Sequence, residues 1–126
     1  VIHLSRHSVL RGRLLAVVGI SGIYEIPLVR NLSVNDDVRL SVEESVRWDC
    51  LKMMPATGPA YYITVGGAEP SGWIDQSWLM ANALSGRGDP LTFHVCSSAN
   101  HFSLVDRICD RQNPEGERFH QWMVDL

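Results

Sequence analysis

Three short stretches of the chain are largely apolar and end at small or polar residues. They cover residues 14–20, 61–66 and 91–96. Runs of this length without polar alternation are typical of strands that are covered on both faces, as in a parallel sheet between helices. The pattern therefore predicts three parallel strands that lie adjacent in chain order and form one edge of a larger sheet.

Apolar residues recur at helical spacing between these runs. A capping box at residues 41–44 predicts a helix that Pro55 ends. A second helix is expected from about residue 73 to residue 84, with Ser71 as its N-cap and Gly86 as its C-terminal cap. The inward-facing side chains are expected to be Val42, Val46, Cys50, Met53 and Met54 in the first helix, and Ile74, Trp78 and Ala81 in the second.

Two further helices are expected near the C-terminus, at residues 102–109 and from Pro114 onward. Residues 1–9 are interpreted as the tail of a helix, and residues 23–40 mostly as a loop with short turns around Pro27 and residues 35–37. The inward-facing side chains of the last two helices are expected to be Phe102, Val105, Ile108 or Cys109, Phe119, Trp122, Met123 and Leu126. Strands that alternate with helices predict an α/β fold, a parallel sheet with flanking helices, within a single domain over residues 1–126.

Composition narrows the kinds of partner that suit this chain. Apolar residues make up 45% of it, the net charge is −3, and no block of like charges occurs. A packed core is expected, and neither nucleic acid nor an anionic membrane is favoured as the main partner. No apolar run reaches the length of a membrane-spanning helix.

The three cysteines carry information about the compartment. Cys50, Cys96 and Cys109 lie in apolar stretches at no metal-like spacing. They are interpreted as buried free thiols in a reducing compartment, which favours a cytoplasmic location. A catalytic cysteine is the alternative, and a small core residue is the favoured interpretation.

Two residues are well placed to do chemistry. Reactive groups of open α/β sheets gather beyond the C-terminal ends of the strands, and Glu69 and His101 follow the second and third predicted strands. A carboxylate beside an imidazole fixes its tautomer and leaves the other ring nitrogen as a general base. The alternatives are a solvated loop charge for Glu69 and a neighbour of a helix cap for His101. The order of acid and then histidine matches the α/β-hydrolase order of serine, acid, histidine.

A serine nucleophile is missing from this pattern. That fold places its serine in Gly-x-Ser-x-Gly on a strand-to-helix turn, and residues 19–23 (GISGI) have isoleucine where the second glycine belongs. Ser21 is therefore interpreted as a strand-end hydroxyl that satisfies the local backbone. Ser5 and Ser8 have no flanking glycines.

The other histidines do not form a metal site. His3 and His7 have the spacing of helical metal ligands, but no third ligand lies near them in the sequence. His94 lies within a strand and is expected to face a helix or a sheet edge, and His120 is expected at the surface of the last helix. No metal and no cofactor are predicted.

Four motifs resemble those of kynurenine formamidases (arylformamidases) and related esterases. Residues 20–26 (ISGIYEI) are similar to the "LSGIYDL" that follows the family's sixth strand, and residues 33–40 (SVNDDVRL) to its "S-x-N-D-x-x-x-L". Residues 65–69 (VGGAE), followed by Gln-Ser on the next helix, resemble the acid loop, and residues 100–102 (NHF) the histidine loop. The match extends from about residue 14 to residue 110, with the motifs in the family's order.

This resemblance implies a serine hydrolase of an ester or aryl formamide, with N-formylkynurenine as a possible substrate. His101 matches the family's base, and Glu69 stands where the family usually has aspartate. The serine elbow, the oxyanion hole and the first strands would lie before Val1, so the chain is expected to be the C-terminal half of the domain and inactive alone. Its partners would be a small ester or formamide and the N-terminal half of the same fold. A general carboxylesterase and a truncated, non-catalytic chain are the alternatives.

Overall fold

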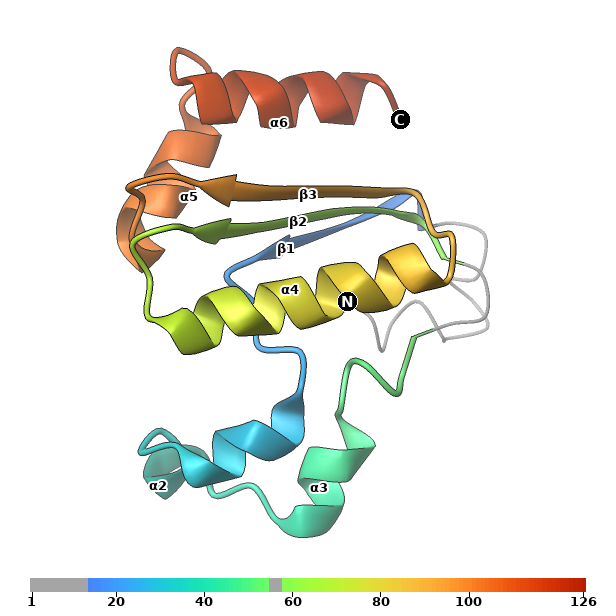
Figure 1. The fold of residues 1–126 in the computed structure, drawn as a ribbon, viewed down its shortest axis with the longest axis vertical. Coiled ribbons are helices and arrows are strands. Elements are labelled where there is room, and N and C mark those ends of the chain that lie inside the picture. The colour runs from blue at the N-terminus through green and yellow to red at the C-terminus, as the bar shows by residue number, and fades with distance from the viewer. Residues whose placement is uncertain (1–13, 55–57) are drawn as a thin grey trace.

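Three parallel strands form the centre of the fold in the computed structural model, which describes residues 14–54 and 58–126. They are β1 (Ala16–Ile20), β2 (Ala60–Gly66) and β3 (Leu91–Cys96), hydrogen-bonded in the order β1-β2-β3 (Figure 1). Both pairings are parallel. The predicted strands, their direction and their order are confirmed, and the predicted helix tail at residues 1–9 lies outside the described residues.

Helices cover both faces of the sheet. The helix α4 (Ser71–Gly86) packs on one face, where Met80 and Leu84 join the core around Tyr61 and Ile63 of β2 (Figure 1). The helix α6 (Pro114–Val124) lies over the opposite face, and its Phe119 and Trp122 rings contact Tyr62 with centroids 5.1 Å away. The helix α5 (His101–Cys109) follows β3 and buries Leu104 and Ile108. Successive β2 side chains point to opposite faces of the sheet. Since the residues from Tyr61 to Gly66 are all buried, both faces of this strand are covered.

The segment between β1 and β2 departs from the prediction in part. The turns expected around Pro27 and residues 35–37 are present as the 3₁₀ helix η1 (Ile26–Asn31) and the short helix α2 (Asn35–Val38). The capping box of Ser41 and Glu44 opens α3 as expected, but α3 (Val42–Arg47) ends well before Pro55. The hydrogen bonds Leu51 N–Asp49 Oδ1 (3.2 Å) and Cys50 N–Tyr24 O (3.0 Å) turn the chain away from the helical path.

Several predicted inward-facing side chains are exposed instead. These are Val42 and Val46 of α3, Trp78 of α4, Phe102 and Val105 of α5, and Met123 and Leu126 at the C-terminus. In α4 the buried residues are Gln76, Ser77, Met80, Ala81 and Leu84, and in α5 they are Leu104 and Ile108. Apolar-rich helices offer two overlapping stripes at three- and four-residue spacing, and contact with the sheet selects one of them.

The ends of α4 also differ from the prediction by one or two residues. Its N-cap is Pro70 rather than Ser71, and its C-cap is Arg87 rather than Gly86. The glycine with a left-handed backbone is Gly88, with φ +73°. The sequence signals therefore located the helix correctly but shifted its caps.

All three cysteines are free thiols, but they are not all buried. Cys96 is fully buried, Cys50 is half-buried and Cys109 is exposed, so the predicted burial of Cys109 was wrong. Burial raises the pKa of the Cys50 and Cys96 thiols above the usual value, which keeps these two unreactive near neutral pH. No helix in the described residues is long and apolar enough to cross a membrane.

Candidate active site

The candidate site lies where β2 and β3 end. The two loops that follow these strands are joined by backbone hydrogen bonds, Gly67 N–Cys96 O (2.8 Å) and Ala68 N–Ala99 O (2.9 Å). Gly66 lies beside them, and a Cβ atom there would be 2.3 Å from the Ala99 carbonyl oxygen. Only glycine allows this close approach, which brings the acid loop and the histidine loop together.

Glu69 and His101 are in hydrogen-bond contact. The distance between Glu69 Oε2 and His101 Nδ1 is 3.0 Å, and the Glu69 side chain is fully buried. The other oxygen, Oε1, accepts from the backbone N–H of Gly66 (2.8 Å) and from the Ser21 hydroxyl. Both predicted residues are thus brought together, and a solvated loop charge does not describe Glu69.

His101 is the first residue of α5. The side chain of the preceding residue, Asn100, caps the helix by accepting from the N–H groups of Phe102 and Ser103 (3.1 and 2.9 Å). The imidazole is half-exposed and lies 5.2 Å, centroid to centroid, from the Trp73 ring. Since Nδ1 donates to a carboxylate that can only accept, Nε2 carries the lone pair that a general base needs.

Ser21 occupies the end of β1, with a backbone φ of +46°. Its N–H donates to Thr64 O (2.9 Å), and its buried hydroxyl donates to Glu69 rather than to the local backbone, which corrects the prediction. This hydroxyl contacts Oε1 of Glu69, whereas His101 contacts Oε2 of the same carboxylate. Within residues 14–54 and 58–126, no serine hydroxyl is hydrogen-bonded to His101.

Sequence reasoning missed two residues that shape this region. Gln76 of α4 accepts from the backbone N–H groups of Tyr24 and Glu25 through its buried Oε1 (2.9 and 2.8 Å), and so ties the segment after β1 to α4. Trp73 packs against His101. The Gln-Ser pair of the acid-loop motif was the available signal for Gln76, and no pattern marked Trp73.

The remaining histidines lie away from this pair. His94 Nε2 is 2.6 Å from Glu115 Oε2 of α6, so His94 faces a helix as expected. His120 is partly buried on α6. His3 and His7, like Ser5 and Ser8, fall outside the described residues. No group of three metal-type side chains gathers in the part of the chain that the structure describes.

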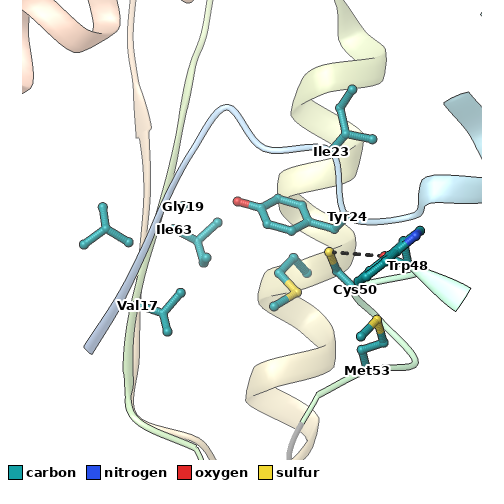
Figure 2. A pocket seen from close by; sticks show the side chains of 10 residues that line it. Val17, Gly19, Ile23, Tyr24, Trp48, Cys50, Met53 and Ile63 are labelled. Atoms are coloured by element: carbon teal, nitrogen blue, oxygen red, sulfur yellow. Dashed lines mark hydrogen bonds between the residues drawn. The ribbon is translucent and has the colours of Figure 1, made fainter. Parts of the chain in front are cut away.

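Two apolar pockets flank the segment after β1. One, of ≈ 240 Å³, lies between η1 and the start of α4, and its walls include Leu28, Val29, Pro70 and Trp73. Trp73 thus contacts both this pocket and the imidazole of His101. The other pocket, of ≈ 220 Å³, is shown in Figure 2 and is lined by neither member of the pair.

The Tyr24 ring projects into this second pocket (Figure 2). It occupies the space that a side chain at Gly19 would need, because a Cβ atom there would lie 2.3 Å from the Tyr24 hydroxyl oxygen. Burial raises the pKa of Tyr24 to about 12. The residue is therefore a neutral part of the core that anchors the segment after β1.

The three parallel strands with their flanking helices match half of an α/β-hydrolase fold. The structure is similar to that of the carboxylesterase Cest-2923 from Lactobacillus plantarum WCFS1, with a TM-score of 0.64 and 10% sequence identity. The alignment covers 99% of this chain and 50% of that chain, so this chain spans about half the length of the esterase. At this identity the likeness shows the fold alone.

The sequence comparisons do not assign the chain to a particular family within this fold. No model of a known protein family matches the chain, and no characterised protein matches its sequence. The fold is therefore that of half an α/β-hydrolase domain, and the predicted likeness to kynurenine formamidases is not supported by these comparisons.

Proposed function

We propose that this chain is the acid–histidine half of a serine hydrolase that cleaves an ester or an aryl formamide. The observation that carries the proposal is the 3.0 Å contact between His101 Nδ1 and the buried carboxylate of Glu69, with the His101 side chain half-exposed. A buried acid that orients an accessible imidazole is the arrangement a serine nucleophile requires of its base.

The nucleophile is proposed to come from the N-terminal half of the same fold, encoded in frame before Val1. β1 pairs with β2 along one edge and with no other described strand, which leaves an edge where further strands can pair. We use "full-length protein" for this chain together with that proposed half. The three free thiols support a reducing, cytoplasmic location for it.

The proposed reaction proceeds through an acyl-enzyme. His101 Nε2 takes the proton of the serine hydroxyl as its oxygen attacks the substrate carbonyl. The imidazolium, stabilised by Glu69, then returns the proton to the leaving alcohol or amine as the bond to the carbonyl carbon breaks. Water attacks the acyl-enzyme with the same help from His101, releasing the acid and restoring the serine.

The pocket between η1 and α4 is proposed to hold the apolar part of the substrate. Its ≈ 240 Å³ suit an aromatic ring or a short acyl chain, and it lies beside Trp73, which contacts His101. The sequence motifs favour an aryl formamide such as N-formylkynurenine, whereas the likeness to Cest-2923 brings a carboxylester into consideration. Both substrates undergo the same chemistry at the carbonyl.

Filling this pocket should change the substrate preference. Leu28 lies in its wall and is partly exposed, so Leu28→Trp in the full-length protein should fill the pocket without disturbing the core. We expect the kcat/KM for N-formylkynurenine to fall at least tenfold relative to that for ethyl acetate, a smaller ester without an aromatic ring. Val124→Trp, at an exposed position of α6, is the control and should leave this ratio unchanged. Equal effects on both substrates would contradict the proposed role of the pocket.

The competing candidate is a non-catalytic chain that keeps the fold without hydrolysing anything. The coding sequence upstream of Val1 discriminates between the two. An in-frame Gly-x-Ser-x-Gly after a strand-like run supports the enzyme, and a start codon with no such motif supports the non-catalytic chain.

A further inference from the structure

We propose that Ser21 is a positioning residue that holds the carboxylate of Glu69 in the orientation His101 needs. The effect on turnover rests on the proposed function, whereas the effect on the Glu69–His101 contact does not. Ser21 is remote from both partners in the sequence, and the sheet brings its hydroxyl to the acid at the end of β1.

The hydrogen bonds of Glu69 divide between its two oxygens. Oε1 accepts the Ser21 hydroxyl from the end of β1 and the Gly66 N–H from the end of β2. Oε2 is thereby left to His101, which follows β3. The single carboxylate joins the ends of all three strands, and the two donors on Oε1 fix the direction in which Oε2 points.

A glutamate needs such an anchor. Ordering its long side chain on folding costs rotamer freedom, and burial adds the cost of desolvating the charge. The Gly66 N–H is one donor, and one bond to Oε1 leaves the carboxylate able to rotate about it. The Ser21 hydroxyl supplies the second bond from a different strand and removes that rotation.

The backbone at position 21 indicates that the side chain matters there. A φ of +46° lies in the left-handed region, which favours glycine and is unfavourable for other residues. A serine in this conformation lowers the stability of the fold, and the buried hydrogen bond from its hydroxyl to Glu69 offsets this loss. Ser21→Gly therefore relieves the backbone while removing the donor, which separates the two effects.

The test is the ring Nδ1–H proton of His101, followed by NMR in the 126-residue chain. The chain with wild-type sequence should show a slowly exchanging, low-field signal, because this proton is held by a buried carboxylate. Ser21→Ala and Ser21→Gly should both speed its exchange with water at least tenfold, because both lack the hydroxyl. Ser45→Ala, which removes a buried hydroxyl bonded to Val42 O, is the matched control and should change nothing.

Activity of the full-length protein gives a second measurement. Ser21→Ala and Ser21→Gly should lower kcat about tenfold with KM within twofold. Turnover falls because the imidazolium that forms during the reaction loses part of its stabilisation by Glu69 when the carboxylate turns away.

The outcomes separate the two proposals. Unchanged exchange of the His101 proton in both Ser21→Ala and Ser21→Gly would overturn the positioning role, whatever the activity. Slow exchange in Ser21→Gly together with fast exchange in Ser21→Ala would also overturn it, since the backbone rather than the hydroxyl would then matter. Faster exchange in a full-length protein that hydrolyses nothing would keep the positioning role and reject the proposed hydrolase function.

Discussion

Replacing His101 by alanine is expected to lower the kcat of the full-length protein by at least three orders of magnitude. Without the imidazole, the proposed serine loses its general base, and removal of a triad member leaves only residual catalysis from binding and the oxyanion hole. Stability should change little. The His101 side chain is half-exposed, so its removal lets water reach Glu69 Oε2 and replace the lost hydrogen bond.

Steady-state kinetics with p-nitrophenyl acetate and urea unfolding of the same samples measure the two effects. His120→Ala is a suitable control, because His120 lies on α6 and has no hydrogen bond to Glu69. Its kcat should stay within twofold of the unmodified protein. A His101→Ala variant that kept most of its activity would remove His101 from the mechanism.

The largest structural effect is expected from Gly66→Ala. Its Cβ would lie 2.3 Å from the carbonyl oxygen and 2.9 Å from the carbonyl carbon of Ala99, which are backbone atoms that cannot rotate away. The histidine loop would have to move away from the acid loop, which would break the hydrogen bond from Ala68 N to Ala99 O. We expect a loss of about 2–4 kcal/mol in the free energy of unfolding, with loss of the His101–Glu69 contact.

Gly86→Ala is the matched control for this substitution. A Cβ atom at Gly86 meets nothing within 4 Å, and the residue lies in the last turn of α4. Alanine there should be neutral or should stabilise the chain by up to about 1 kcal/mol, because it reduces the freedom of the unfolded chain. Urea unfolding of the 126-residue chain compares the two variants. Equal stability of both would show that the loops do not approach as closely as described.

The sheet and the acid–histidine pair were predictable because each depends on a strong local signal. A strand buried on both faces must be largely apolar, as β2 is, and parallel strands bring their C-terminal ends to one edge. The faces of the helices were not predictable in the same way. In α5, the stripe through Phe102 and Val105 and the stripe through Leu104 and Ile108 are both apolar, and only packing decides between them.

Two other features depend on contacts between distant parts of the chain. The end of α3 is set by the Asp49 side chain and by the pairing of Cys50 with Tyr24, neither of which leaves a pattern in the sequence. The hydroxyl of Ser21 meets Glu69 only because β1 and β2 are adjacent and in register. A serine at a strand end is equally compatible with a bond to its own backbone, which is what the sequence alone favoured.

Labelling with a fluorophosphonate probe, which reacts with activated serines, tests the central claim most directly. The account predicts that the 126-residue chain alone is neither labelled nor able to hydrolyse p-nitrophenyl acetate. In the full-length protein, the probe should label the serine of an upstream Gly-x-Ser-x-Gly, and His101→Ala should abolish the labelling. Labelling of Ser21 in the chain alone, with turnover that Ser21→Ala abolishes, would contradict the account and make Ser21 the nucleophile.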